Sequence, residues 1–331
     1  MIPQPIPSCQ TAAWQKAQQQ AVRDPAELLR LLALSASLLP AARKAAERFP
    51  LRVPHAFIAR MQRGNPDDPL LRQVLPLADE LADHPGFGTD PVGDGDARRA
   101  PGLLQKYTGR ALLIVTATCA AHCRYCFRRH FPYPENRRLD AALATIARDD
   151  SLGEIILSGG DPLSLSDARL SDLLDRLEAV PHLRRLRIHS RHPVLLPERV
   201  TDELCHRLAT CRVPVVMVMH TNHAQEIDET VRTAFRRLRE TGMTLLNQSV
   251  LLRGVNDDVA SLVSLSEALF DAGVLPYYLH QLDRVAGAAH FEVDDHRALA
   301  LHAQLRARLP GYLVPRLVRE APGEPAKSPL F

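Results

Sequence analysis

The sequence predicts an α/β fold in which parallel strands alternate with helices in a complete or partial barrel, behind an N-terminal helical region. Six apolar, β-rich runs lie at 112–118, 154–158, 185–189, 213–219, 244–252 and 275–282, and an amphipathic segment follows each one. The run at 213–219 is almost continuously apolar, which is typical of a parallel strand buried on both faces. Right-handed crossovers curl such units into a barrel, although an open doubly wound sheet would show the same pattern.

The first hundred residues predict a separate region. Residues 11–85 have the pattern of helices broken by prolines, with apolar positions at helical spacing over 26–45 and 69–82. The stretch 86–96 is rich in Gly and Asp, and we interpret it as a surface linker. We therefore expect an N-terminal helical region and linker over 1–100, a partial (β/α)6 barrel over 101–318 and a C-terminal segment over 319–331.

Composition narrows the class of protein. Forty-one basic residues stand against 38 acidic ones with no basic tail, so nucleic acid is not a favoured partner. The N-terminus lacks the pattern of a leader, and no apolar run reaches the roughly 20 residues of a membrane helix. We expect a cytoplasmic protein without a membrane partner. Three of the six cysteines fall within eight residues, while Cys9, Cys205 and Cys211 are scattered, which favours a metal over disulfides.

Polar residues cluster where the predicted strands end. In barrels of this kind the reactive side chains sit at the carboxyl ends of the strands. The residues at or near those ends are Cys119, Ser158, Gly159, Gly160, Asp161, Ser190, Arg191, His220, Gln248 and Asp283. The pattern predicts a functional site at this end of the sheet, whether or not the barrel closes.

The strongest single motif is the array Cys119, Cys123 and Cys126, directly after the first predicted strand. Three thiolates on one short loop can hold three irons of a [4Fe-4S] cluster and leave the fourth iron open to another ligand. A zinc site would need a fourth Cys or His, and His122 lies inside the tight loop where its reach is poor. Three unrelated cysteines are the remaining alternative.

This array, with the aromatic Tyr125 before its last cysteine, resembles the radical S-adenosylmethionine (SAM) superfamily. The resemblance implies that the open iron binds the methionine moiety of SAM, and that one electron cleaves the sulfonium to a 5′-deoxyadenosyl radical. The stretch Ser158 to Asp161 resembles the glycine-rich motif that meets the methionine amino group, where glycine permits close backbone approach. On its own a Gly-Gly turn is more often a simple loop. We assign Ser190 to the same cofactor site.

Longer stretches resemble one subfamily, the lysine 2,3-aminomutases, and especially the short bacterial members that make β-lysine for modifying elongation factor P. The resemblance begins at about residue 46. It is carried by 49–54 (FPLRVP), 68–76 (DPLLRQVLP), 119–129 (CAAHCRYCFRR), 157–163 (LSGGDPL), 247–257 (NQSVLLRGVND) and 321–327 (APGEPAK). It implies an isomerase that moves an amino group between adjacent carbons of a free amino acid.

The resemblance also implies a pyridoxal phosphate (PLP) site. Lys327 occupies the place of the lysine that binds this cofactor covalently, although a lysine so near the C-terminus would otherwise be read as a solvated tail. Tyr107 and Arg110 match residues around the cofactor, and the forked guanidinium suits a phosphate. Gln248 and His220 match further pocket residues. For His220, a hydrogen-bonded core histidine is the alternative.

Three residues match the substrate site of the family. Arg128 matches the arginine that holds the substrate carboxylate, and Asp283 and Glu320 match an acidic pair that receives the distal ammonium of lysine. Two buried anions are costly without a cation between them, so the pair favours a basic substrate. Glu320 stands where the known lysine enzymes have aspartate, one methylene shorter. Free L-lysine is the expected substrate, because a peptide-bonded α-nitrogen could not react.

Two other functions stay open: a mutase for another amino acid such as glutamate, and a non-catalytic metal-binding interaction module. The chain departs from the larger lysine mutases at 323–326, where they have a run of glycines, and Asp258 stands near the place of a zinc-binding cysteine. We expect no structural zinc and a monomer or dimer. Reduced flavodoxin or ferredoxin is the expected electron donor, and a ligase is expected to link the product to elongation factor P.

Overall fold

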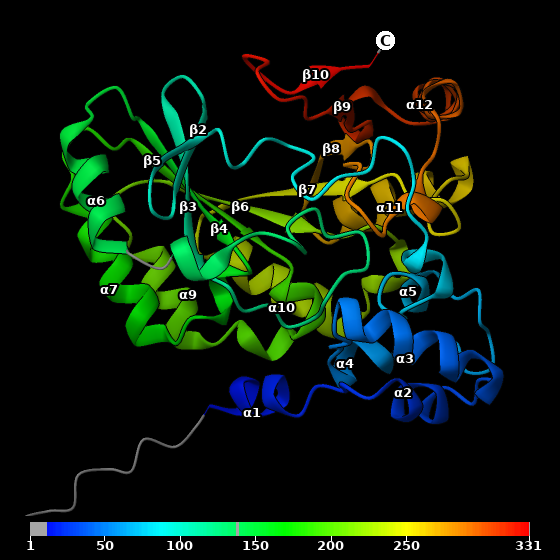
Figure 1. The fold of residues 1–331 in the computed structure, drawn as a ribbon. Coiled ribbons are helices and arrows are strands. Elements are labelled where there is room, and N and C mark those ends of the chain that lie inside the picture. Colours follow the sequence, from blue (N-terminus) through cyan, green and yellow to red (C-terminus); the bar gives the residue numbers. More distant parts are fainter. Residues whose placement is uncertain (1–11, 137–138, 331) are drawn as a thin grey trace, which may run out of the picture.

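A computed structural model describes residues 12–136 and 139–330, and its strands form one sheet (Figure 1). Cys9 lies outside the described residues. The strands are β1 (Arg98–Ala100), β2 (Leu103–Tyr107), β3 (Arg110–Thr116), β4 (Glu154–Gly159), β5 (Arg185–Ser190), β6 (Val215–His220), β7 (Thr244–Val250), β8 (Leu275–His280), β9 (Arg316–Arg319) and β10 (Ser328–Pro329).

The ten strands lie in the sheet in their order along the chain. Strands β3 to β9 pair in parallel, whereas β1, β2 and β10 pair antiparallel at the two ends. Within the described residues no pairing joins β1 to β10, so the sheet is a partial barrel. The six predicted strands correspond to β3–β8, which confirms the expected fold class. The parallel strand β9 was not predicted.

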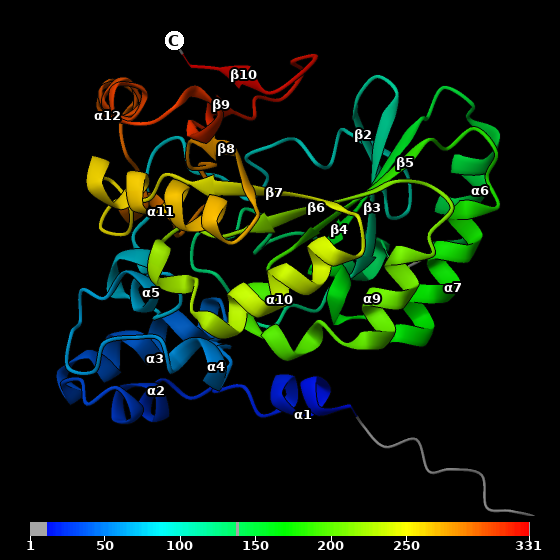
Figure 2. The same cartoon turned by 180° about the vertical axis from the view of Figure 1, so that it is seen from behind.

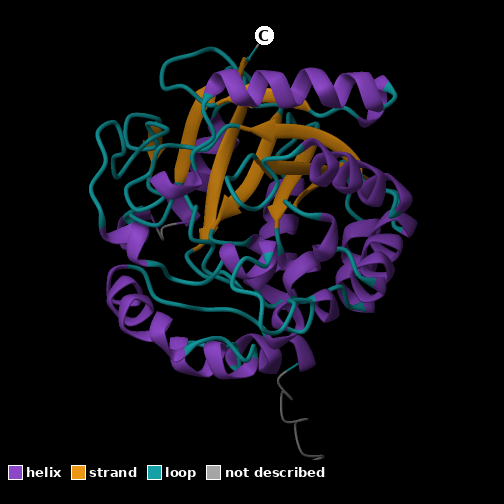
Figure 3. Ribbon diagram, turned by 90° about the vertical axis from the view of Figure 1, so that its right-hand side faces the viewer, coloured by secondary structure: helices purple, strands orange, loops and turns teal. Residues whose placement is uncertain are grey.

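Helices fill the connections and lie outside the curved sheet (Figure 3). The α-helices are α1 (Ala13–Gln19), α2 (Pro25–Leu31), α3 (Leu39–Arg48), α4 (His55–Ile58), α5 (Pro69–Arg72), α6 (Leu139–Arg148), α7 (Asp167–Glu178), α8 (His192–Leu195), α9 (Asp202–Ala209), α10 (Glu229–Glu240), α11 (Val259–Asp271) and α12 (Asp295–Arg308). The 3-10 helices are η1 (Ala36–Leu38), η2 (Ala78–Leu81), η3 (Tyr133–Asn136), η4 (Pro162–Ser164), η5 (Pro197–Arg199), η6 (Ala224–Glu226), η7 (Ala289–Phe291) and η8 (Gly311–Leu313).

Five of the helices that follow the parallel strands begin where the sequence supplies a capping side chain. Each of α7, α9, α10, α11 and α12 is preceded by a residue whose side-chain oxygen accepts a backbone N–H of the first turn. These caps are Ser166, Thr201, Asp228, Asp258 and Asp294. The buried residues of α10 recur at helical spacing and face the strands. Asp258, the residue near the expected zinc position of larger relatives, thus begins a helix here.

The N-terminal helices α1–α5 group along one side of the barrel, as Figures 1 and 2 show. The buried side chains of α2, α4 and α5 share one hydrophobic cluster with Ala120 and Ala121 of the cysteine loop and with Leu195 and Leu196 of α8 and its end. The backbone N–H of His122 also donates to the carbonyl of Arg52. The N-terminal region is therefore a wall that supports the cysteine loop.

The stretch 86–96 is exposed over most of its length, as expected of a surface linker, but two of its residues are buried. Val92 is 2% exposed and Asp94 is 3% exposed, and Gly88 forms a bridge with Val285. The prediction was wrong for Val92 and Asp94. An aspartate in a segment rich in Gly and Asp can be buried when its carboxylate meets cations. Asp94 does so in the site described below.

Among the described residues, none of the helices combines the length and apolar character needed to cross a membrane.

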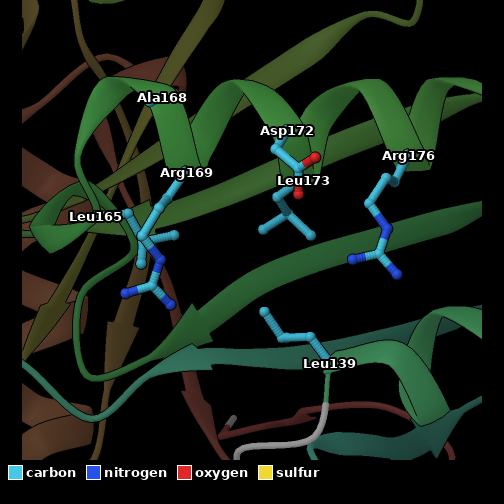
Figure 4. Close-up of a pocket in the computed structure, with 7 residues that line it drawn as sticks. All are labelled: Leu139, Leu165, Ala168, Arg169, Asp172, Leu173 and Arg176. Atoms are coloured by element: carbon cyan, nitrogen blue, oxygen red, sulfur yellow. The ribbon is translucent and has the colours of Figure 1, made fainter.

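A surface pocket lies apart from the strand ends, between α6 and α7, where Figure 4 shows Arg169 and Arg176 extending towards Leu139. No predicted site residue lines this pocket.

Candidate active site

The three array cysteines lie in the loop after β3, close enough for each thiol to influence the pKa of another. Burial raises the pKa of the Cys126 thiol to about 11, with a further contribution from Cys123. Burial also raises the pKa of Cys119 well above its usual value, and Cys126 and Cys123 add to the effect. Such thiols stay protonated unless a bound cation compensates their charge. The mutual influence of the three thiols shows that their sulfurs lie near one another, as a shared metal centre requires.

The described residues contain no group of three His, Cys, Asp or Glu side chains placed to hold a single metal ion. A [4Fe-4S] cluster makes a different demand, because each cysteine binds its own iron. His122 is engaged elsewhere: its Nδ1 lies 2.8 Å from the Pro50 carbonyl oxygen, and its ring stacks on Phe49 at 5.1 Å between centroids. The residues present thus fit a cluster held by three cysteines.

A buried ion-pair group attaches the cysteine loop to the N-terminal wall. Arg124 donates from Nε to Glu80 at 2.8 Å, and Arg129 donates to the same carboxylate at 2.9 Å. The side chains of Arg124 and Glu80 are almost fully buried. Sequence reasoning missed Glu80, because nothing in its local pattern distinguishes it from a surface glutamate of a helical region.

The glycine-rich motif packs against the residues that precede Cys119. A Cβ atom added to Gly160 would lie 2.4 Å from the Thr118 carbonyl oxygen, and one added to Gly159 would lie 2.6 Å from that of Thr116. The N–H groups of Gly160 and Asp161 donate to these same two carbonyls. The glycines are therefore required for backbone contact within the protein, and this contact positions the start of the cysteine loop.

Replacing Gly160 with alanine is expected to displace the cysteine loop, because the clash is with backbone that cannot rotate away. Strain of this kind costs roughly 1–3 kcal/mol. We expect a lower free energy of unfolding and less iron bound per chain after anaerobic reconstitution. Gly311→Ala is the matched control, since nothing lies within 4 Å of its added Cβ. Equal iron content in the two variants would contradict this account.

Asp161 and Ser190 connect the ends of β4 and β5. Asp161 accepts hydrogen bonds from Ser190 Oγ at 2.8 Å and from the Arg191 N–H at 2.7 Å. Burial alone would raise the pKa of Asp161, but His192 and these donors hold it below its usual value. Both residues lie at the predicted strand ends, and their side chains bind each other and nearby protein groups.

A continuous ion-pair network brings together residues from distant parts of the chain. Lys106 Nζ lies 2.7 Å from Asp94 Oδ1 and 2.8 Å from Glu320 Oε1. Lys327 pairs with the other oxygen of Glu320. Arg128 donates from Nε to Asp94 Oδ2 at 2.8 Å. The network thus links the C-terminal segment to Arg128, two residues after the last cysteine of the array.

Arg128 also donates from a terminal guanidinium nitrogen to Ser158 Oγ at 3.1 Å, which joins the network to the end of β4.

Three residues of this network, Arg128, Glu320 and Lys327, were predicted as site residues from the sequence. Lys106 and Asp94 were not predicted as site residues. Lys106 precedes the predicted Tyr107, and Asp94 was concealed by the composition of its segment. The network shares its two anions, Asp94 and Glu320, among three cations.

Asp283 borders this network. Burial and the nearby Glu320 carboxylate raise the pKa of Asp283 to about 7, against the opposing effect of Lys327 and Lys106. Burial also raises the pKa of Tyr107, and Glu320 adds to the effect. The guanidinium carbon of Arg110 lies 4.6 Å from the centroid of the Tyr107 ring. These predicted residues therefore share one environment around Glu320.

His220 and Gln248 are register neighbours on β6 and β7, and Tyr278 continues the row on β8. His220 Nε2 lies 3.0 Å from the hydroxyl oxygen of Tyr125, and the two rings stack. Burial and the positive charge of Arg191 lower the pKa of His220 to about 3, so the imidazole is neutral near pH 7. His220 thus contacts the cysteine loop directly.

A buried histidine on β5 offers a polar atom to the Lys327 side of the site. Within the described residues, His189 Nε2 is buried and has no hydrogen-bond partner. Burial lowers the pKa of His189, and the charges of Arg187, Lys327 and Arg128 contribute. Lys327 Nζ itself lies 5.9 Å from the centroid of the Tyr278 ring. An unpartnered buried polar atom that feels the charge of Lys327 fits a site that binds a polar ligand such as PLP.

Comparison with known proteins adds an independent finding. The Radical SAM superfamily model matches residues 113–265. L-lysine 2,3-aminomutase of Escherichia coli (strain K12) is 55% identical over 314 residues, covering 93% of this chain and 92% of that protein. The protein of the same name from Haemophilus influenzae is 46% identical over 319 residues, covering 95% and 94%. That from Buchnera aphidicola is 43% identical over 312 residues, covering 93% and 92%.

Proposed function

The chain belongs to the L-lysine 2,3-aminomutase family of radical SAM enzymes, and on that basis we propose that it converts free L-lysine to β-lysine. The α-amino group of the substrate moves to the adjacent carbon. The observation that carries the proposal is the ion-pair network that joins Lys327 and Glu320 to Arg128, with the Asp283 carboxyl group close enough to feel the charges of Glu320 and Lys327. These residues supply anions for an ammonium and a cation for a carboxylate, within one site next to three cysteines.

The residues present fit three cofactors. Cys119, Cys123 and Cys126 would hold a [4Fe-4S] cluster, Lys327 would hold PLP, and SAM would bind beside the cluster. When bound, the cluster and SAM supply a carbon radical, and PLP stabilises the unpaired electron while the nitrogen moves. We place Tyr107, Arg110, His220 and Gln248 around PLP. Ser158, Gly159, Gly160, Asp161 and Ser190 would shape the SAM side, chiefly by positioning the cysteine loop.

Substrate recognition rests on charge. Arg128 is fixed by Asp94 and Ser158, so its guanidinium is positioned to receive a carboxylate. Glu320 and Asp283 would receive the distal ammonium of lysine. A dicarboxylic amino acid would instead place a second anion beside two carboxylates, which is unfavourable in a buried site. The α-amino group must be free to react, so free lysine is favoured over a lysine within a protein chain.

The acidic pair provides the test of this proposal. Asp283→Asn and Glu320→Gln are expected to raise the KM for lysine strongly, because removing one partner of a buried charge pair costs about 2–5 kcal/mol. Glu292→Gln is the control, since Glu292 pairs with Arg284 on the surface. Initial rates with lysine and with glutamate distinguish the substrates. A variant that keeps lysine turnover, or a wild-type protein that prefers glutamate, would contradict the assignment.

Lysine affinity is also expected to rise as the pH increases through about 7, the pKa to which burial and Glu320 raise Asp283. Below that pH the free protein holds a proton on Asp283, and binding an ammonium must expel it. Above that pH the carboxylate is already ionised. Calorimetric titration at about pH 6 and about pH 8 measures the difference. Asp283→Asn should remove this pH dependence of lysine affinity. Equal affinities of the wild-type protein at the two pH values would refute the assigned role of Asp283.

The remaining proposals concern context and rest on the family resemblance. We propose that reduced flavodoxin or ferredoxin supplies the electron, because the cluster needs a one-electron donor of low potential. We propose that a ligase transfers the β-lysine to elongation factor P, which places this enzyme upstream of that modification. A cytoplasmic location and a monomeric or dimeric state accompany these proposals.

A further inference from the structure

A buried cation lies against one sulfur of the cysteine array. Arg191, the residue after β5, donates a hydrogen bond from one terminal guanidinium nitrogen to Cys123 Sγ at 2.8 Å. Its side chain is 6% exposed. None of the roles assigned above to the cofactors or the substrate uses this guanidinium. Its position next to a ligand of the proposed cluster therefore calls for a separate explanation.

The surroundings of Arg191 fix the guanidinium in place. The same nitrogen donates to the Tyr125 hydroxyl at 2.7 Å, and the other terminal nitrogen donates to Gln73 at 2.6 Å and to Glu226 at 2.9 Å. Asp161 binds the backbone N–H of Arg191. These partners come from the N-terminal wall, the cysteine loop, η6 and the end of β4. The cation cannot rotate away from the sulfur without breaking several buried hydrogen bonds at once.

Glu226 is the counter-ion of this cation and is itself fully buried. Its other oxygen accepts the N–H of Asn222 at 2.9 Å and the Gln73 amide at 3.2 Å. Burial alone would raise the pKa of Glu226, but Arg191 and these donors hold it below its usual value, so it is an anion. Two opposite charges thus lie in series behind Cys123, with the positive one in contact with the sulfur.

Charge and hydrogen bonding at a ligand sulfur set the reduction potential of an iron–sulfur cluster. A one-electron reduction adds a negative charge to the cluster, and a fixed cation at the sulfur stabilises that reduced form. The effect is large because the site is buried and water screens it poorly. A buried anion just beyond the cation has the opposite effect, and a weaker one because it is more distant from the sulfur.

We propose that Arg191 is a positioning residue that raises the reduction potential of the cluster through Cys123, and that Glu226 moderates this effect. This inference rests on the proposed function, because it requires a [4Fe-4S] cluster on the three cysteines. The electron still comes from the external low-potential donor and enters the cluster. Arg191 alters only how readily the cluster accepts it.

The experiment is a potentiometric titration of the reconstituted full chain without SAM, in which electron paramagnetic resonance measures the reduced cluster. Arg191→Met is expected to shift the midpoint potential to a more negative value, and Glu226→Gln to a more positive one. The midpoint potential of Arg191→Lys should lie between those of the wild type and Arg191→Met, because lysine keeps the positive charge and loses the two-nitrogen geometry of the guanidinium. Arg207→Met, which removes an arginine paired with Asp175 and Glu178 on outer helices, should leave the potential unchanged.

Opposite shifts are the key result, because a general loosening of the site would move both potentials in the same direction. Shifts of one sign, or an unchanged potential in Arg191→Met with full iron content, would overturn the proposal. If all Arg191 and Glu226 variants failed to bind a cluster, the proposal would be overturned, because the two residues would then be needed to assemble the cluster and not to set its reduction potential. Absence of a cluster signal in the wild-type protein would instead overturn the proposed function.

Discussion

Replacing Lys327 with alanine is expected to abolish covalent PLP binding and to lower lysine turnover by roughly a thousandfold or more, the scale on which loss of a covalent catalytic group acts. The chain contains only four lysines, at 16, 44, 106 and 327. Of these, Lys327 and Lys106 both contact the carboxylate of Glu320. The absorbance of the bound cofactor and the rate of β-lysine formation are the measurements.

Lys106 provides the matched control, because it lies in the same network and is the natural competitor for the cofactor. Lys106→Met is expected to retain covalent PLP, although it removes a partner from both Asp94 and Glu320. Borohydride reduction followed by peptide mapping identifies the modified residue. A label on Lys106, or covalent PLP in Lys327→Ala, would show that Lys327 is not the cofactor lysine. The PLP site would then lie at Lys106 on β2.

Replacing Asp94 with alanine is expected to have the second largest effect, on stability and on substrate binding together. Asp94 is 3% exposed and contacts Arg128 at 2.8 Å and Lys106 at 2.7 Å. Its loss leaves the buried Arg128 guanidinium without its carboxylate. Breaking a buried pair in this way costs about 3–5 kcal/mol. We also expect a higher KM for lysine, because Arg128 is no longer fixed to receive the substrate carboxylate.

Asp96→Asn is the control for this variant, because Asp96 is exposed in the same segment. Chemical denaturation gives the free energy of unfolding, and initial rates give KM. Asp94→Asn separates the two effects, since an amide keeps the shape of the carboxylate and loses its charge. If Asp94→Ala kept the stability and the KM of the wild type, other groups would hold Arg128 in place. The proposed role of Asp94 in positioning Arg128 for the substrate carboxylate would then be wrong.

The sheet was predictable because its central strands bury both faces and therefore leave long apolar runs in the sequence. Strand β9 was missed because Arg316–Arg319 is short and has arginine at both ends. Its place in the sheet follows from pairing with β8, which involves no local signal. The antiparallel strands at the two ends of the sheet are hidden for the same reason.

The cysteine array was identified because a short spacing brings three ligands together within one loop. Asp94 and Lys106 could not be identified in this way, since their role arises from contacts with residues 128 and 320, far away in the chain. Arg191 was visible only as a polar residue after a strand. Its contact with Cys123 depends on the packing of the β5 end against the cysteine loop.

The glycine motif was located correctly at the end of β4, while the structure supplies a different physical reason for it. Sequence reasoning explained Gly159 and Gly160 by close approach to a ligand. The structure shows that both approach the backbone of Thr116 and Thr118. The glycine motif can therefore be recognised from its own residues, although the reason for the glycines is the close backbone at the end of β3, outside the motif.

The most direct test of the central claim is product analysis after anaerobic incubation of the reconstituted protein with SAM, PLP, a reductant and free L-lysine labelled at its α-amino nitrogen. The account predicts β-lysine whose label has moved to the adjacent carbon, formed only when both cofactors are present. Unchanged lysine alongside conversion of another amino acid, or a label that stays on the α-carbon, would contradict it.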